Sequence, residues 1–172
     1  MKVVCSMLLV MLACRAIAAP ITEAAVLPAR APALLVLRDQ FDLPQTLAFP
    51  STNIVFLTIA DKAGSEQLAG WIAPVKHRFG ERINIRGIAD VSPVPRLLRS
   101  LVRKKFRELQ TYPVMMDWTG AAVKAFTYVP AQANVLVVDG RGQILLRTSG
   151  PATERALQEL CAVIDRALAA QK

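Results

Sequence analysis

The chain has 172 residues, of which 53% are hydrophobic and 20% are charged. This length suits one ordinary domain with a sizeable core, and the composition excludes an intrinsically disordered chain. The formal net charge of +8 favours anionic neighbours such as lipid headgroups, cell-wall polymers or acidic proteins. Nucleic acid is not expected as a partner, because the chain begins with an export signal.

The first 18 residues have the three parts of a secretory signal peptide. Lys2 supplies the positive charge, an apolar run follows over 3–13, and Ala-Ile-Ala at 16–18 is a small-x-small cleavage site. The run of 11 residues is too short to span a bilayer core about 30 Å thick. We therefore expect a periplasmic or secreted protein. A permanent N-terminal anchor and a lipoprotein attached at Cys14 stay open as alternatives.

Cleavage after residue 18 would leave a mature chain with a single cysteine. Cys5 and Cys14 lie in the leader, so only Cys161 remains and no intramolecular disulfide can form. Residues 19–33 are rich in Ala and Pro and lack periodicity, which predicts a flexible arm. The folded domain is expected over 34–172.

Strand and helix patterns alternate from the start of this domain. A short apolar run over 34–37 predicts a strand, and the β-branched run over 53–60 predicts a strand buried on both faces. Apolar residues three or four apart predict a helix over 65–79, in which Pro74 predicts a kink. The alternating residues 83–89 predict the next strand.

The second half of the chain combines short elements with a hairpin. The patterns predict, in order, a helix over 95–109, a short strand over 114–116, a short helix over 119–126, strands over 134–138 and 143–148, and a last helix from 151 to about 169. Asp-Gly-Arg-Gly at 139–142 predicts the turn between the last two strands. We therefore expect parallel strands joined by crossover helices first, then an antiparallel hairpin with a covering helix.

This order resembles the thioredoxin-like superfamily in its redoxin form, as in peroxiredoxins and periplasmic thiol-disulfide proteins. The likeness is carried by residues 35–39 with Leu47, by 55–61, by 112–117 and by 135–144. The resemblance spans about 34–169. It implies a three-layer α/β/α fold whose central mixed sheet has a C-terminal β-hairpin and a covering helix.

The resemblance also places the family's active site in the turn after the central strand. There, two reactive cysteines sit at the start of a helix, which lowers the thiol pKa. In this chain the turn comprises Asp61, Lys62, Ala63, Gly64, Ser65 and Glu66. Ala63 and Glu66 align with the two cysteines, and neither can form a thiolate. The family's cis-proline position aligns with Ala133, and Pro130 lies three residues earlier.

Other side chains that could carry chemistry have structural explanations. Ser65 is expected to cap the first helix, because the only histidine, His77, lies twelve residues further along that helix. Cys161 falls in the apolar stripe of the last helix and is expected to be a buried structural thiol. We expect no cofactor and no metal. An acidic ligand site at the strand ends stays open, formed by Asp61, Asp117 and Asp139.

The helix over 95–109 carries six basic residues and only one acidic residue, Glu108. The basic residues are Arg96, Arg99, Arg103, Lys104, Lys105 and Arg107. A solvated face explains such a run, and an anion-binding or membrane-binding surface is the alternative.

We therefore expect a redox-inactive binding or scaffold module of the bacterial envelope. Its partner would be an envelope protein or an anionic surface. Two alternatives stay open. One is a thiol-disulfide oxidoreductase or peroxidase that acts through an atypical site such as Cys161, and the other is a membrane-surface protein that uses the basic helix 95–109.

Overall fold

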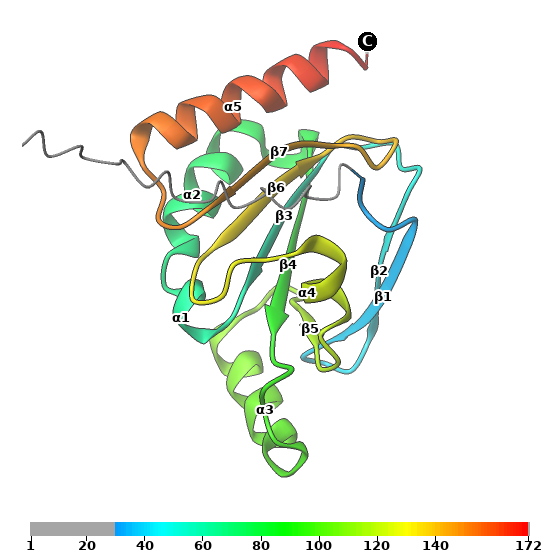
Figure 1. Cartoon of the computed structure of the whole chain (residues 1–172), viewed down its shortest axis with the longest axis vertical. Helices are drawn as coiled ribbons and strands as arrows, with labels where there is room; N and C mark the ends of the chain where they lie inside the picture. Colours follow the sequence, from blue (N-terminus) through cyan, green and yellow to red (C-terminus); the bar gives the residue numbers. More distant parts are fainter. Residues whose placement is uncertain (1–29, 172) are drawn as a thin grey trace, which may run out of the picture.

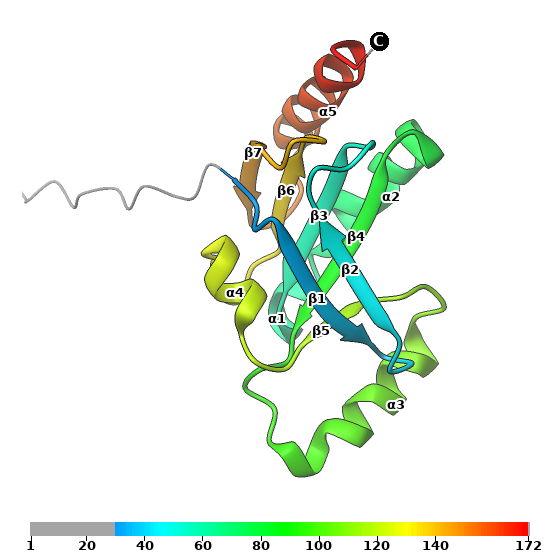
Figure 2. The same ribbon diagram turned by 90° about the vertical axis from the view of Figure 1, so that its right-hand side faces the viewer.

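The computed structural model describes residues 30–171 (Figures 1 and 2). The predicted signal peptide over 1–18, the lipoprotein alternative at Cys14 and the arm residues 19–29 lie outside the described residues. The strands are β1 (Leu34–Asp39), β2 (Pro44–Ala48), β3 (Val55–Ala60), β4 (Asn84–Asp90), β5 (Met115–Asp117), β6 (Asn134–Val138) and β7 (Ile144–Ser149). They form one sheet in the order β2-β1-β5-β4-β3-β6-β7.

The centre of this sheet is mixed, as predicted. β4 pairs in parallel with β3 on one side and with β5 on the other. β6 runs antiparallel to β3 and forms a hairpin with β7. All six residues of β3 are buried, which agrees with the continuous apolar run over 53–60. The parallel strands β3, β4 and β5 end at the same edge of the sheet, whereas β6 ends at the opposite edge.

The strand pair β1–β2 extends the sheet beyond β5. The sequence predicts β1 but not β2, which is an edge strand of five residues without clear alternation. Residues 30–33, the last part of the predicted flexible arm, pack against the domain. The Ala31 N–H donates to the Gly142 carbonyl at 2.8 Å, and the Ala31 side chain is buried in a core. The packed domain therefore includes these four residues as well as those from 34 onward.

Helices cover both faces of the sheet (Figure 1). They are α1 (Lys62–Ser65), α2 (Leu68–Phe79), α3 (Arg99–Leu109), α4 (Ala121–Phe126) and α5 (Glu154–Ala169), with 3-10 helices at Gly80–Arg82 and Arg96–Leu98. α2 and α5 enclose one core around Trp71, Phe56 and Ile164. α4 encloses the other core, where Phe126 packs with Leu57. Two buried interfaces on opposite sides of one sheet produce the predicted three-layer architecture.

The predicted helix over 65–79 is divided in the structure, and the prediction that Ser65 caps it is wrong. α1 ends at Ser65, and α2 begins at Leu68. The cap of α1 is Asp61, whose Oδ1 accepts a hydrogen bond from the Gly64 N–H at 2.8 Å. An aspartate before the first turn satisfies a backbone donor that the helix itself cannot.

α3 differs from the other helices because it extends away from the sheet at one end of the molecule (Figures 1 and 2). None of its residues is fully buried. Val102 and Phe106 attach it to a small core that contains Val114 and Met116. Among residues 30–171, no helix has the length and apolar character needed to cross a membrane.

Candidate functional site

The candidate site is the turn over Asp61–Glu66, where β3 leads into α1. Lys62, Ala63, Ser65 and Glu66 are exposed, and only Gly64 is buried. The residues aligned with the family's two cysteines therefore lie at the surface, as reactive thiols must. Exposed cysteines at these positions could take part in thiol chemistry, but the turn contains no cysteine.

A loop over 129–133 lies directly against this turn. Asp61 Oδ2 accepts a hydrogen bond from the Ala131 N–H at 2.7 Å, and Gln67 Oε1 accepts one from the Ala133 N–H at 3.1 Å. A Cβ added to Gly64 would lie 2.3 Å from the Gln132 carbonyl oxygen, so this close approach requires glycine. The loop and the turn therefore form one packed unit.

Ala131 adopts a positive φ of 59° in this loop, which L-residues other than Asn and Asp rarely do. Its N–H points at Asp61 in that conformation. The family's cis-proline has no counterpart here. The described residues contain one cis peptide bond, between Phe49 and Pro50, so the bond before Pro130 is trans.

Behind the turn, a tyrosine joins two carboxylates from neighbouring strand ends. The Tyr128 hydroxyl donates to Asp90 Oδ2 at 2.7 Å and lies 3.4 Å from Asp61 Oδ2. Asp90 Oδ1 accepts hydrogen bonds from the N–H and the hydroxyl of Ser92, at 3.0 and 2.7 Å. Sequence reasoning missed this network, although Asp61 and Asp90 each end a predicted strand. The sequence does not show that Tyr128, which is distant from both aspartates along the chain, lies between them in the fold.

The network perturbs the acidity of its members. Burial raises the pKa of Tyr128, and the adjacent carboxylates of Asp90 and Asp61 raise it further. Burial also acts to raise the pKa of Asp61. Hydrogen bonds from the backbone of Gly64 and Ala131 outweigh it, so the pKa of Asp61 is lowered. Tyr128 therefore remains a neutral donor and Asp61 remains a charged acceptor over the physiological range.

The nucleophiles considered from sequence are not brought to this turn. The Ser65 hydroxyl donates to the Lys62 carbonyl at 2.7 Å, within α1. His77 is exposed in the last turn of α2, and a helix of this length spans about 18 Å. His77 is therefore too far from Ser65 to activate it as a general base.

Cys161 lies near that same distant end of α2, because Arg78 and Asp165 are its charged neighbours. It is half-buried against the α2–α5 core. Burial raises its pKa, Asp165 raises it further, and Arg78 opposes both. A thiol with a raised pKa and partial burial is a poor nucleophile at neutral pH.

Asp61, Asp117 and Asp139, the alternative acidic ligand site, do not lie together in the structure. Asp117 is fully buried and caps α4, accepting hydrogen bonds from four backbone N–H groups. Asp139 accepts from the N–H groups of Arg141 and Gln143 in the β6–β7 turn, at the edge of the sheet opposite Asp61. Within residues 30–171, no three His, Cys, Asp or Glu side chains are grouped to hold a metal ion.

The structure divides the six basic residues of the α3 region into two sets. Arg99 and Arg103 lie over the indole of Trp118, at 5.1 and 5.7 Å from the ring centroid. Arg103 also pairs with Asp42 at 3.0 Å. These two arginines therefore attach the helix. The exposed set, which remains available to a partner, is Arg96, Lys104, Lys105 and Arg107.

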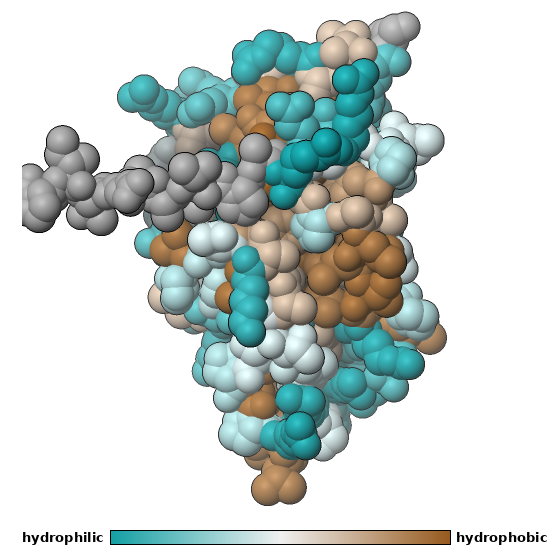
Figure 3. Space-filling view, turned by 45° about the vertical axis from the view of Figure 1, so that its right-hand side comes forward, coloured by the Kyte–Doolittle hydropathy of each residue, from teal (hydrophilic) through white to brown (hydrophobic). Residues whose placement is uncertain are grey.

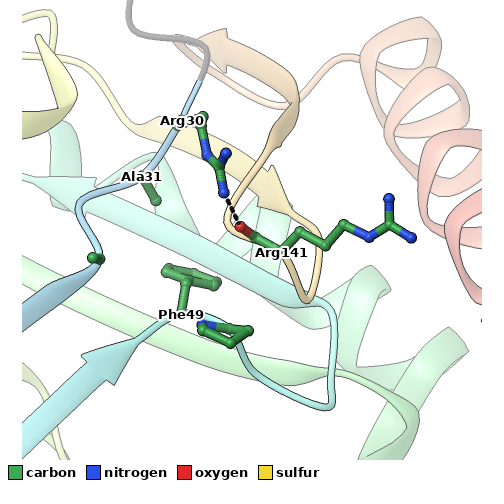
Figure 4. A pocket seen from close by; sticks show the side chains of 6 residues that line it. Arg30, Ala31, Phe49 and Arg141 are labelled. Atoms are coloured by element: carbon green, nitrogen blue, oxygen red, sulfur yellow. Dashed lines mark hydrogen bonds between the residues drawn. The ribbon is translucent and has the colours of Figure 1, made fainter.

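A shallow pocket lies beside the β6–β7 turn (Figure 4), at the edge of the sheet opposite the turn over 61–66. It has a volume of about 420 Å³ and is lined by Arg30, Phe49, Pro50 and Arg141, among others. The Arg30 guanidinium donates to the Arg141 carbonyl at 2.7 Å, while the Arg141 side chain extends away from Phe49. The pocket therefore has no contact with the turn or with the Tyr128 network.

No protein-family model matches the chain, and no curated protein matches it at a significant level. Solved structures do match. A putative thiol:disulfide interchange protein DsbE from Chlorobium tepidum is 14% identical, with a TM-score of 0.63 over 83% of this chain and 97% of its own.

Two further structures give the same result. The exposed lipoprotein thioredoxin Etrx1 of Streptococcus pneumoniae is 13% identical, with a TM-score of 0.59 over 77% of this chain and 99% of its own. StoA of Bacillus subtilis is 15% identical, with a TM-score of 0.58 over 78% and 99%. Identities this low establish a likeness of fold alone. The chain therefore has a thioredoxin-like α/β fold, and its structural neighbours include thioredoxins and thiol:disulfide interchange proteins.

Proposed function

We propose that the protein is a redox-inactive binding module of the bacterial envelope, built on the thioredoxin-like fold. The observation that carries this proposal is the state of the turn over 61–66. It has no cysteine, and Gly64 and Asp61 hold it against the 129–133 loop. The only cysteine in the described residues, Cys161, is half-buried near the far end of α2.

The partner-binding face proposed here is the exposed rim of the same turn, formed by Lys62, Ala63, Ser65 and Glu66. The fixed backbone beneath it favours binding, because a rigid surface loses little conformational freedom when a partner docks. An envelope protein is the proposed partner. The predicted signal peptide over 1–18 supports this location.

The redox part of the proposal is tested with residues 30–172, which contain every strand and helix described above. Insulin-disulfide reduction and peroxide consumption are measured for this segment and for Cys161→Ser, with a true thioredoxin as the positive control. We expect no thiol-dependent turnover from either form. Turnover that disappears in Cys161→Ser would instead establish the oxidoreductase or peroxidase alternative.

The binding part is tested in cells with the full chain. A photo-crosslinking amino acid is placed at Glu66 on the rim, or at Arg155 on α5 as a matched exposed control. We expect a discrete crosslinked envelope protein from the Glu66 position only. Identical products from both positions, or none from Glu66, would contradict the proposed face.

A further inference from the structure

The projecting end of the α3 region exposes three leucines to different extents. Leu97 is 92% exposed, Leu101 is 62% exposed and Leu98 is 48% exposed. They lie where the 3-10 helix Arg96–Leu98 leads into α3, at the tip of the projection (Figures 1 and 2). The space-filling view shows apolar surface at this tip (Figure 3). We name Leu97, Leu98 and Leu101 the leucine tip.

The leucine tip is not the side of α3 that packs against the domain. Val102 and Phe106 already face the domain, and Arg99 and Arg103 already cover Trp118. On a helix, residues 97 and 101 lie on the side opposite 102 and 106. Leu97 and Leu101 therefore point away from Val102 and Phe106, whereas the half-exposed Leu98 lies between the two sides.

Positive charge surrounds the leucine tip. Arg96 adjoins it in sequence, and Lys104 and Lys105 follow one turn after Leu101. The only acidic residue of α3, Glu108, is paired with Lys105 at 3.5 Å. Lys104 lies about 10 Å along the helix axis from Leu97, at 1.5 Å of rise per residue.

We propose that this tip inserts into an anionic lipid bilayer surface. The leucines would enter the boundary between headgroups and acyl chains, which amphipathic segments penetrate to about 5–10 Å. Lys104 and Lys105 then lie level with the lipid phosphates, where each cation adds to the attraction. The inference is independent of the proposed function of the turn.

The shape of the tip favours a bilayer over a protein partner. The leucine tip consists of three residues, whereas a stable protein–protein interface takes about 20–30 residues from each partner. A fluid bilayer closes around such a projection without needing complementary shape. The combination of apolar tip and cationic flank matches the two requirements for binding anionic lipid.

The experiment measures co-sedimentation of the full chain, without its predicted signal peptide 1–18, with vesicles of phosphatidylcholine alone or of phosphatidylcholine with an equal part of phosphatidylglycerol. We expect binding to the mixed vesicles at about 20 mM NaCl, with a loss of about tenfold or more in affinity at about 300 mM. Binding to phosphatidylcholine alone should be weaker by a similar factor. No binding to the mixed vesicles at low salt would overturn the proposal.

Matched variants separate insertion from general attraction. Leu97→Ser/Leu101→Ser should lower affinity about tenfold, whereas Leu109→Ser, at the far end of α3 and 65% exposed, should not. Lys104→Glu/Lys105→Glu should abolish binding, and the equal charge change Arg155→Glu/Arg166→Glu on α5 should not. All of these positions are exposed, so the melting temperatures should stay close to that of the wild type.

Two outcomes would count against insertion. Unchanged binding of Leu97→Ser/Leu101→Ser to the mixed vesicles would show that surface charge alone causes the binding. Binding to polyglutamate that is as tight as binding to the mixed vesicles would assign the surface to acidic proteins. As a direct readout, Leu97→Trp should show blue-shifted emission with the mixed vesicles, because an indole that enters the bilayer leaves water.

Discussion

Asp117 shows how much of this fold depends on single buried side chains. Its two carboxylate oxygens accept hydrogen bonds from the N–H groups of Thr119, Ala121, Ala122 and Val123 at 2.7–3.2 Å. Asp117→Ala removes the acceptor of all four bonds, of which the one to Ala122 is buried and the other three are partly buried. We expect the free energy of unfolding to fall by about 2–4 kcal/mol in urea denaturation.

The matched control is Asp165→Ala, which removes the exposed ion pair between Arg78 and Asp165. Exposed pairs contribute little, so the loss should be much smaller than for Asp117→Ala. Equal losses for the two variants would contradict the assignment of Asp117 as the main cap of α4.

Asp61 makes the stability of the candidate site depend on pH. Burial acts to raise the pKa of its carboxyl group, but hydrogen bonds from the backbone of Gly64 and Ala131 outweigh this effect. The pKa of Asp61 is therefore below the ordinary value of 3.8. A group whose pKa is lower when folded stabilises the fold above its unfolded pKa, and this contribution is lost as the pH falls through its folded pKa.

The expected result is a difference between two pH profiles. Between about pH 5 and pH 2, the free energy of unfolding of the wild type should fall more steeply than that of Asp61→Asn, which has no such proton to bind. Urea denaturation at a series of pH values measures both profiles. Parallel profiles would show that Asp61 is not the carboxylate that the turn stabilises.

At the scale of elements, the contact between α1 and the 129–133 loop is the most constrained in the site. Gly64→Ala would improve helix propensity in isolation. In the fold its Cβ would meet the Gln132 carbonyl at 2.3 Å, so the loop must move and its bonds to Asp61 and Gln67 weaken. We expect a loss of about 2 kcal/mol or more in the free energy of unfolding.

Gly87→Ala in β4 provides the control for this substitution. A Cβ there would lie 3.6 Å from the Thr58 hydroxyl, which is ordinary contact. Because glycine weakens a strand interior, this change should be neutral or slightly stabilising in the same denaturation assay. A similar loss in both variants would contradict the specific overlap at Gly64.

The elements that could be predicted from sequence are those with a strong local pattern. β3 is recognisable because a continuous β-branched run has few alternatives to a strand buried on both faces. The β6–β7 hairpin is recognisable from its Asp-Gly-Arg-Gly turn. β2 was missed because Pro-Gln-Thr-Leu-Ala has no clear alternation, and pairing with β1 makes it a strand.

Contacts between distant segments limited the prediction of α3. The sequence shows a run of basic residues over 95–109, but it cannot show that Arg99 and Arg103 meet Trp118. The same limit applies to Ser65. Its residue type fits a cap, yet the earlier Asp61 takes that role because β3 ends there.

At the scale of the whole molecule, topology decides which strand ends share a site. Asp61 and Asp90 both contact the Tyr128 hydroxyl because β3 and β4 are parallel and end at the same edge of the sheet. Asp139 lies at the opposite edge because β6 is antiparallel to β3. The family resemblance predicts a turn after the central strand, and β3 does lead into α1 there. It could not reveal that the 129–133 loop closes against the turn, since that contact depends on Gly64 and on the positive φ of Ala131.

Restoring the two cysteines tests directly whether this fold still supports thiol redox chemistry. In a Cys161→Ser background, Ala63→Cys/Glu66→Cys places one thiol within α1 and one directly after its last residue, both at exposed positions. Both positions face the solvent, as reactive thiols must, in the turn where the resemblance places the family's cysteines. We expect the double variant to oxidise to an intramolecular disulfide, detected by loss of free thiols, and to gain measurable insulin reduction.

The control is Glu159→Cys/Ala162→Cys in the same background, with the same spacing at exposed positions in the middle of α5. Backbone N–H groups there are already bonded within the helix, so no thiolate is favoured and no reduction is expected. If the α1 variant folds but stays as inactive as this control, the 129–133 loop rather than the missing cysteines is what prevents the reaction. Activity in the α1 variant alone would show that loss of two side chains separates this protein from a working redoxin.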